Sequence, residues 1–112
     1  MSNEYIKLES EMKRGFLQVL VLVLLDKPMY GYMMLKHLES IGYAIEESTL
    51  YPLLRRLEKN ELIRSKWDVG ADRPRKFYTV SQKGKDVKER LLVIWEQQDT
   101  ILKSQQKEEK NV

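Results

Sequence analysis

Apolar residues recur along this chain in blocks whose spacing predicts four helices and one hairpin. The longest block, "FLQVLVLVLL", covers residues 16–25 and is interrupted only by Gln18. Its valines would also suit a buried strand, but helix-favouring residues lead into it from Glu9 without a break, and "DKP" at residues 26–28 ends it abruptly. We therefore expect a first helix over residues 5–26 that is apolar on all sides and partly covered by a second subunit.

The next apolar stretch, "MYGYMMLKHLESIG" at residues 29–42, predicts a second helix. Its apolar stripe consists of Met34, Leu35, Leu38 and Ile41. Gly42 follows the stripe and is the usual type of residue just beyond a helix end. The loop "YAIEE" then leads into the third element.

A third helix is predicted within "STLYPLLRRLEKNELI", residues 48–63. Ser48 or Thr49 can cap it, and Pro52 then falls in the first turn, where a missing backbone N–H costs little. Four leucines, at positions 50, 53, 54 and 57, share one face. The opposite face and its two shoulders carry Ser48, Thr49, Tyr51, Pro52, Arg55, Arg56 and Lys59. Such a face is either simply solvated or directed at an anionic partner.

Two short segments predict a hairpin, because the first has apolar residues on one face and charged residues on the other, and the second is rich in aromatic and β-branched residues. They are "LIRSKWDV" at residues 62–69 and "RKFYTV" at residues 75–80, joined by a loop of about four or five residues. Ile63 and Trp67 share one strand face, so we expect Trp67 to pack rather than to contact a ligand. An isolated hairpin is barely stable, so this one should lean on the helices.

A long final helix is predicted over residues 81–106, with Ser81 as its cap. Its apolar positions recur at gaps of three and four, the spacing of a seam against another helix. They are Val87, Leu91, Leu92, Ile94, Trp95, Ile101 and Leu102. We expect residues 107–112 to form a frayed tail and residues 1–112 to form a single domain.

The positive charge of the chain is concentrated in its middle. Residues 48–90 hold 12 Lys/Arg against 6 Asp/Glu, a net of +6, whereas residues 1–47 have 5 against 7, a net of −2, and residues 91–112 have 3 against 4, a net of −1. This distribution is typical of a surface that meets a polyanion.

Composition excludes several other classes. There is no cysteine, which removes disulfides and thiolate metal sites and suits the cytoplasm, and no apolar run approaches the roughly 20 residues that a membrane helix needs. His37 is the only histidine and lacks clustered carboxylates, and no phosphate-binding loop or nucleophile motif is present. We therefore expect neither an enzyme nor a metal or cofactor site.

The order of these elements is that of a winged helix-turn-helix, in which the third helix enters the major groove of DNA and the hairpin follows the backbone. The two basic elements are thus the two that this fold directs at DNA. We expect a mainly α fold with a small two-stranded antiparallel hairpin, an α+β class. Residues 5–80 would form the winged helix-turn-helix with its N-terminal helix, and residues 81–106 a dimerisation helix.

The chain also resembles PadR-like transcriptional regulators over residues 12–105. The resemblance rests on "YGYMMLKHL", "STLYPLLRRLEKNELI" and "RKFYTVSQKGK", and "TLYPLLRRLE" is its most specific part. Two departures are visible. Asn60-Glu61 stands where the family usually has a glycine, and we expect Asn60 to tolerate the left-handed conformation there. The hairpin loop "GADRPRK" is stiffer and less basic than in relatives.

The resemblance implies a homodimeric repressor on a near-palindromic operator, built through the N-terminal and C-terminal helices. DNA-contact candidates are Tyr30, Tyr32, Thr49, Tyr51, Pro52, Arg55, Arg56, Lys59, Lys66, Arg73, Arg75 and Lys76. Arginines can read guanine edges, while the hairpin cations mainly contact phosphates. For both tyrosines at positions 30 and 32, packing beside Gly31 is the alternative.

The short C-terminal helix resembles the compact, multidrug-sensing branch of that family. This resemblance implies that Trp95 from each subunit flanks a flat pore in which a planar aromatic or amphiphilic molecule stacks. The ligand candidates are Phe16, Gln18, Leu92, Val93, Trp95, Glu96 and Asp99, of which Asp99 would favour a cation. A purely structural role of Trp95 in the dimer core is the alternative. For the whole protein, the alternative function is a winged-helix module that binds an acidic protein surface.

Overall fold

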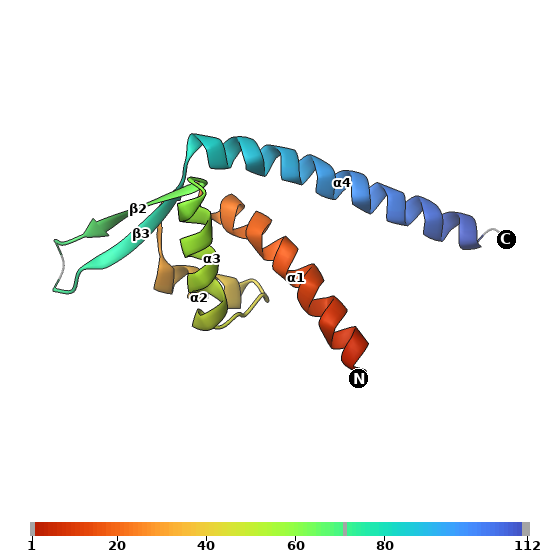
Figure 1. Cartoon of the computed structure of the whole chain (residues 1–112), viewed down its shortest axis with the longest axis horizontal. Helices are drawn as coiled ribbons and strands as arrows, with labels where there is room; N and C mark the ends of the chain where they lie inside the picture. The colour runs from red at the N-terminus through yellow and green to blue at the C-terminus, as the bar shows by residue number, and fades with distance from the viewer. Residues whose placement is uncertain (1, 71, 111–112) are drawn as a thin grey trace.

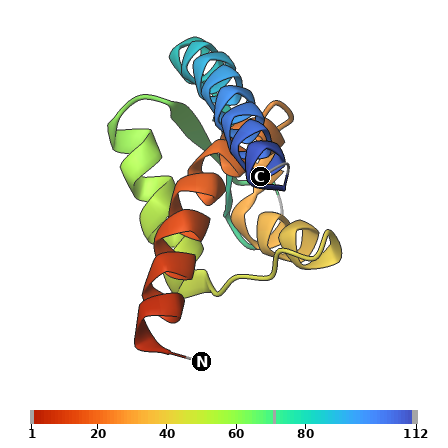
Figure 2. The same ribbon diagram turned by 90° about the vertical axis from the view of Figure 1, so that its right-hand side faces the viewer.

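The computed structural model describes residues 2–70 and 72–110 of the 112-residue chain. Within them, the elements are α1 (Asn3–Leu24), β1 (Met29–Tyr30), α2 (Gly31–Ser40), α3 (Glu47–Lys59), β2 (Ile63–Asp68), β3 (Arg75–Val80) and α4 (Gln82–Lys110). The first three helices cluster beside a small sheet, from which α4 runs in one direction while the β2–β3 hairpin points in the other (Figure 1). In Figure 2, viewed toward the C-terminal end of α4, α2 and α3 lie on either side of α1. The predicted α+β class is confirmed.

The predicted hairpin is present, but it belongs to a three-stranded antiparallel sheet rather than a two-stranded one. The strand order is β1-β3-β2, and Met29 and Tyr30 of β1 pair with Tyr78 and Phe77 of β3. The prediction missed β1 because its two residues directly precede α2 and look like its first turn. The loop between β2 and β3 spans residues 69–74, one more than the upper expectation, and position 71 lies outside the described residues.

The hydrophobic core fills the space between α1, α2, α3 and the sheet. It consists of Leu17, Val21, Leu22, Leu25, Met34, Leu38, Leu50, Leu53, Leu54, Leu57, Ile63, Tyr78 and Val80. All four leucines of the predicted α3 stripe are in this cluster, so the opposite face of α3 is turned to solvent. The core therefore fixes which side of α3 is available to a partner.

The ends of α1 and α3 differ from the sequence predictions. The hydroxyl of Ser2 accepts a hydrogen bond from the N–H of Tyr5 (3.2 Å), so α1 begins at Asn3 rather than at residue 5 and ends at Leu24. Glu46 rather than Ser48 or Thr49 occupies the N-cap position of α3, because its carbonyl already accepts the N–H of Leu50 (3.1 Å), and the Ser48 hydroxyl is directed at the Glu46 carboxylate (3.5 Å). Pro52 therefore lies in the second turn, and its predicted place in the first turn was wrong.

The turn after α3 is kept, but Glu61 and not Asn60 takes the left-handed conformation. Glu61 has φ 63°, whereas Asn60 has φ −84°. The N–H of Leu62 bonds the carbonyl of Leu57 (2.9 Å) and the N–H of Glu61 bonds that of Glu58 (2.9 Å). This pair of bonds is a Schellman motif, in which the left-handed residue is the one after the C-cap. Because α3 ends at Lys59 with Asn60 as the C-cap, the strained position falls on Glu61.

The fourth helix starts where predicted and continues further. The hydroxyl of Ser81 accepts the N–H of Gly84 (3.0 Å) and donates to the carbonyl of Glu61 (2.7 Å), so its capping role is confirmed. Residues 107–110, expected to be frayed, are helical, and Asn111 and Val112 lie outside the described residues. No helix of the described residues is long and apolar enough to span a bilayer.

Candidate nucleic-acid interface

The solvent face of α3 carries the predicted contact residues. Thr49, Pro52, Arg55, Arg56 and Lys59 are all exposed, while the leucines behind them are buried. The helix is held by those leucines on one side only, so its polar side chains can meet a partner without any change in the core. The prediction of a two-faced helix is confirmed.

Within the part of the chain that the structure describes, most of the candidate cations have no carboxylate partner. Among residues 2–70 and 72–110, no carboxylate lies within 4.0 Å of the charged groups of Arg55, Arg56, Lys59, Lys66, Arg73 or Arg75. All six residues are exposed. Their charges are therefore available to an external anion, and they lie on α3, β2, the hairpin loop and β3.

Lys76 is the exception, because it belongs to a contact that joins the hairpin to α3. Its Nζ lies 3.4 Å from Oε1 of Glu58, and the other carboxylate oxygen of Glu58 accepts a hydrogen bond from Ser65. The Lys76 ammonium also lies 5.5 Å from the ring centroid of Tyr78. These contacts fix the angle between α3 and the hairpin, and they engage the Lys76 ammonium inside the protein.

Tyr30 anchors the loop end of the hairpin to the start of α2. Its hydroxyl donates to Oδ2 of Asp68 (2.6 Å), and the guanidinium of Arg75 lies 4.3 Å from its ring centroid. The hydrogen bond from Tyr30, together with that from the N–H of Gly70, lowers the pKa of Asp68, and the same Tyr30–Asp68 bond raises the pKa of Tyr30. The structure thus gives Tyr30 a contact inside the protein, whereas Tyr32 is exposed with Lys36 5.5 Å from its ring centroid.

Tyr51 is half-buried rather than displayed on the outer face of α3. A Cβ at Gly31 would lie 2.8 Å from Cε1 of Tyr51, so the glycine makes room for this ring. Burial raises the pKa of the Tyr51 hydroxyl. The ring therefore packs α3 on α2, and it is the least exposed of the candidates on α3.

Sequence reasoning missed Glu58 and Asp68, the two carboxylates that position the basic elements. Each stands among basic residues in the sequence, where it reads as a surface charge. Their partners, Lys76 and Tyr30, are 18 and 38 residues away, so no local spacing indicates the contact. The expectation for Trp67 was wrong, since 62% of it is exposed on β2.

The ligand candidates fall into two groups. Phe16, Trp95 and Asp99 line a groove of about 670 Å³ between α1 and α4, together with Met12, Val19, Leu91, Ile94 and Leu102. Gln18, Leu92, Val93 and Glu96 do not line it in the single chain. Asp99 pairs with Lys103 (2.9 Å), which offsets its charge toward a cationic ligand.

Comparison with known proteins places this arrangement among transcriptional regulators. The family model described as the transcriptional regulator PadR-like family matches residues 19–90. An uncharacterized protein of Lysinibacillus sphaericus is 32% identical over 98 residues, which cover 83% of this chain and 90% of that protein.

Solved structures show the same fold. A PadR family transcriptional regulator from Eggerthella lenta is 38% identical and superposes with a TM-score of 0.79 over 90% of this chain and 94% of its own. Bacillus subtilis PadR, whose structure was solved in complex with operator DNA, is 24% identical, with a TM-score of 0.64 over 70% of this chain and 47% of its own.

Proposed function

This chain belongs to the PadR-like family of transcriptional regulators, and we propose that it is a sequence-specific repressor that binds a near-palindromic operator as a homodimer in the cytoplasm. The observation that carries the proposal is the set of six exposed cations on α3 and the hairpin that have no carboxylate partner among the described residues. In a winged helix-turn-helix these two elements face the major groove and the phosphate backbone. Bacillus subtilis PadR, which shares the fold, provides a precedent for this fold on operator DNA.

The proposed contacts divide by chemistry. Arg55 and Arg56, in the middle of α3, would read base edges, since a guanidinium matches the two acceptors of guanine. Thr49, Tyr51, Pro52 and Lys59 would complete the contact of α3. Lys66, Arg73 and Arg75 would position the hairpin on phosphates, and Tyr32 would add a hydroxyl near the start of α2. Lys76 would act indirectly, by holding the hairpin against α3 through Glu58.

The dimer is supported by apolar side chains that the single chain leaves exposed. On α1 these include Ile6, Leu8 and Met12, and on α4 they include Ile101 and Leu102, each at least half exposed. Exposed apolar patches of this kind mark association surfaces. We propose that α1 and α4 of two subunits cover each other and that the two α3 helices then address the two half-sites.

The groove beside Trp95 suggests a route to release from DNA. Trp95 is 48% exposed in the single chain, so a planar aromatic molecule could stack on its indole and on that of the second subunit. Phe16 and Asp99 line the same groove. We propose this as the effector site, with Leu92, Val93 and Glu96 contributing after the second subunit is in place.

The test is the double substitution Arg55→Gln with Arg56→Gln. The change removes two groups that meet bases, so binding to a duplex selected by the unaltered protein should weaken by at least about thirtyfold, since each such contact contributes about 1–3 kcal/mol. Binding is measured by fluorescence anisotropy of the labelled duplex.

A matched control removes the same charge elsewhere. The pair Arg90→Gln with Lys85→Gln, both exposed near the start of α4, should leave duplex affinity within a fewfold of the original. Sedimentation of every variant checks that the dimer persists. Equal duplex affinity of the two double variants would contradict the assignment of α3 and favour a module that binds an acidic protein.

A further inference from the structure

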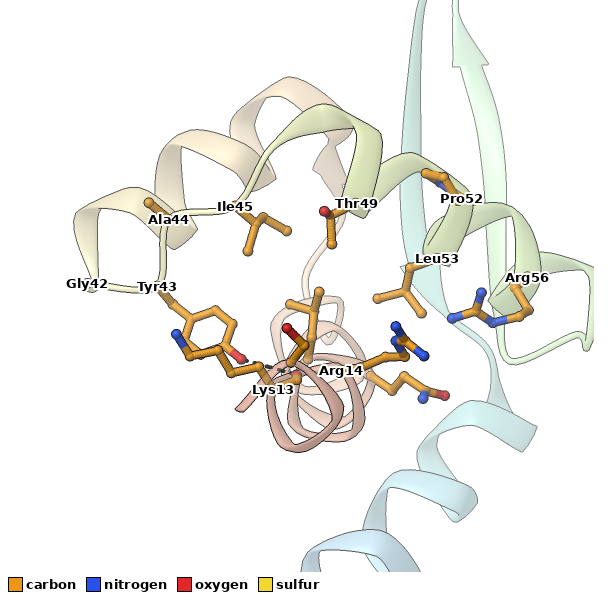
Figure 3. Close-up of a pocket in the computed structure, with 13 residues that line it drawn as sticks. Lys13, Arg14, Gly42, Tyr43, Ala44, Ile45, Thr49, Pro52, Leu53 and Arg56 are labelled. Atoms are coloured by element: carbon orange, nitrogen blue, oxygen red, sulfur yellow. Dashed lines mark hydrogen bonds between the residues drawn. The ribbon is translucent and has the colours of Figure 1, made fainter. Parts of the chain in front are cut away.

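A second cavity, of about 900 Å³, lies on the side of α1 away from α4. It is enclosed by α1, the loop after α2 and the outer edge of α3, and its side chains converge as shown in Figure 3. Its volume lies in the range of pockets that hold small organic ligands, roughly 300–1,000 Å³. Neither Trp95 nor any other residue of α4 lines it.

The floor of this cavity is apolar and firmly held. Leu17 and Leu53 form part of it and are 4% and 3% exposed, so they are anchored in the core. Ile45 adds to the apolar wall. The Tyr43 hydroxyl donates to the carbonyl of Lys13 (3.1 Å), which joins the loop to α1 and fixes the ring as one side of the cavity.

The charged side chains at the rim are all cationic. Lys13, Arg14 and Arg56 line the cavity, and no aspartate or glutamate does. Lys13 pairs with Glu9 outside it (3.0 Å), whereas no carboxylate of the described residues lies within 4.0 Å of Arg14 or Arg56. Two guanidinium groups from α1 and α3 thus face one cleft without a counter-charge, an arrangement that concentrates anions.

We propose that this cavity binds a small amphiphilic anion, with its carboxylate or sulfonate between Arg14 and Arg56 and its apolar body on Leu17, Ile45 and Leu53. Two oxygens of a carboxylate or of a sulfonate can accept paired hydrogen bonds from a guanidinium, and a lysine cannot offer that geometry. The amide of Gln18, one helical turn after Arg14, provides a further donor at the rim.

Occupancy of the cavity affects DNA binding if α3 acts as proposed above. Arg56, Thr49 and Pro52 belong both to the cavity and to the proposed DNA face of α3. An anion that holds Arg56 withdraws it from the duplex, so each ligand weakens the other by the same factor. This coupling rests on the proposed function, whereas the binding of the anion does not.

The binding test uses a pair of fluorescent probes that differ by one anionic group. Anilinonaphthalene sulfonate carries the charge, and N-phenylnaphthylamine has the same rings without it. On the DNA-free protein, Arg14→Gln should weaken the sulfonate probe about tenfold and leave the neutral probe within about twofold, because only the charged contact is lost. Ala44→Glu, a change of an exposed cavity residue, should weaken the sulfonate probe by a similar factor.

Two controls separate this cavity from other surfaces. Arg90→Gln removes the same charge from exposed α4 and should leave both probes unaffected, and Trp95→Ala should leave the sulfonate probe bound at this cavity. Equal affinity of Arg14→Gln and Arg90→Gln for the sulfonate probe would overturn the proposal. Loss of that probe in Trp95→Ala alone would overturn it as well, by assigning the probe to the groove between α1 and α4.

The coupling is measured by repeating the duplex titration with a saturating amount of the sulfonate probe. We expect the probe to weaken the duplex affinity of the unaltered protein. In Arg14→Gln, which binds the probe poorly, the duplex affinity should stay at its probe-free value. Unchanged duplex affinity would overturn the coupling while leaving the anion site in place. Failure of the probe-free protein to bind any duplex would refute the proposed function, and the titration on DNA-free protein would still decide the anion site.

Discussion

Glu61 ends α3 in a backbone conformation that normally belongs to glycine. Its φ of 63° matches the 85° of Gly42, which ends α2 with the same pair of hydrogen bonds, Tyr43 N–H to Leu38 and Gly42 N–H to Glu39. The left-handed conformation costs a residue with a Cβ about 1–2 kcal/mol, and glycine avoids this cost. The two helix ends therefore form an internal comparison of one motif with and without strain.

Exchanging the residue types at these two positions should change stability in opposite directions. Glu61→Gly relieves the strain and should raise the free energy of unfolding by about 0.5–1 kcal/mol after the greater flexibility of the unfolded chain is deducted. Gly42→Ala introduces the strain and should lower it by about 1 kcal/mol. Urea unfolding followed by circular dichroism measures both, and a loss of stability in Glu61→Gly would show that the Glu61 side chain contributes more than its backbone costs.

For single residues, the sequence predicted which side chains are exposed better than it predicted which side chains contact each other. Arg55 and Arg56 lie on the solvent side of α3, as helical spacing of 100° per residue predicts, because burial of the leucines fixes the rotation of the helix. The anchoring of Tyr30 by Asp68 could not be predicted, since it depends on how the hairpin docks on α2. To predict that Glu61 rather than Asn60 adopts the left-handed conformation, the end of α3 would have to be known to within one residue. Sequence patterns do not locate helix ends that closely.

Among the elements, α4 depends on a close approach at its first turn. A Cβ at Gly84 would lie 2.0 Å from the carbonyl oxygen of Leu62 and 2.7 Å from a methyl group of Val80. The N–H of Ser81 also donates to the same Leu62 carbonyl (3.0 Å). The start of α4 is thus packed directly on the backbone turn between α3 and the hairpin, and glycine is the residue that permits this.

Gly84→Ala should therefore destabilise the protein, since backbone atoms of the turn must move to admit a methyl group. We expect a loss of about 2 kcal/mol or more, the usual size of overpacking in a fixed site. Gly15→Ala is the matched control, because it lies within α1 with no atom within 4 Å of the added Cβ. It should be neutral or add up to about 1 kcal/mol through helix propensity. Thermal unfolding of both variants measures the difference. Equal stability of Gly84→Ala and Gly15→Ala would contradict the close approach of Gly84 to the turn.

Element identities followed from periodicity, and their contacts did not. All four helices and the hairpin were predicted because each has its own apolar spacing or turn signal. β1 was missed since two residues carry no period, and it exists only because β3 is there to pair with it. The contact of Glu58 with Lys76 and Ser65, which orients the hairpin on α3, likewise arises from the tertiary arrangement.

The whole molecule is elongated, with principal extents of 64 × 34 × 24 Å. The basic surface lies on α3 and the hairpin, while much of the exposed apolar surface lies on α1 and on α4, which extends away from them (Figure 1). This separation allows one part to associate with a second copy while the other meets an anion. The order of elements indicated this division in the sequence, because the basic third helix and hairpin lie between the apolar first helix and the apolar seam of the last one.

The central claim is that this molecule recognises a particular duplex through its basic surface. The most direct measurement is selection of duplex fragments of the source genome by the purified protein at two salt concentrations, followed by sequencing. We predict enrichment of a two-fold symmetric site whose affinity falls steeply with salt, with a log–log slope of about 0.9 for each phosphate neutralised. Enrichment of no sequence above background at either salt concentration would contradict the claim.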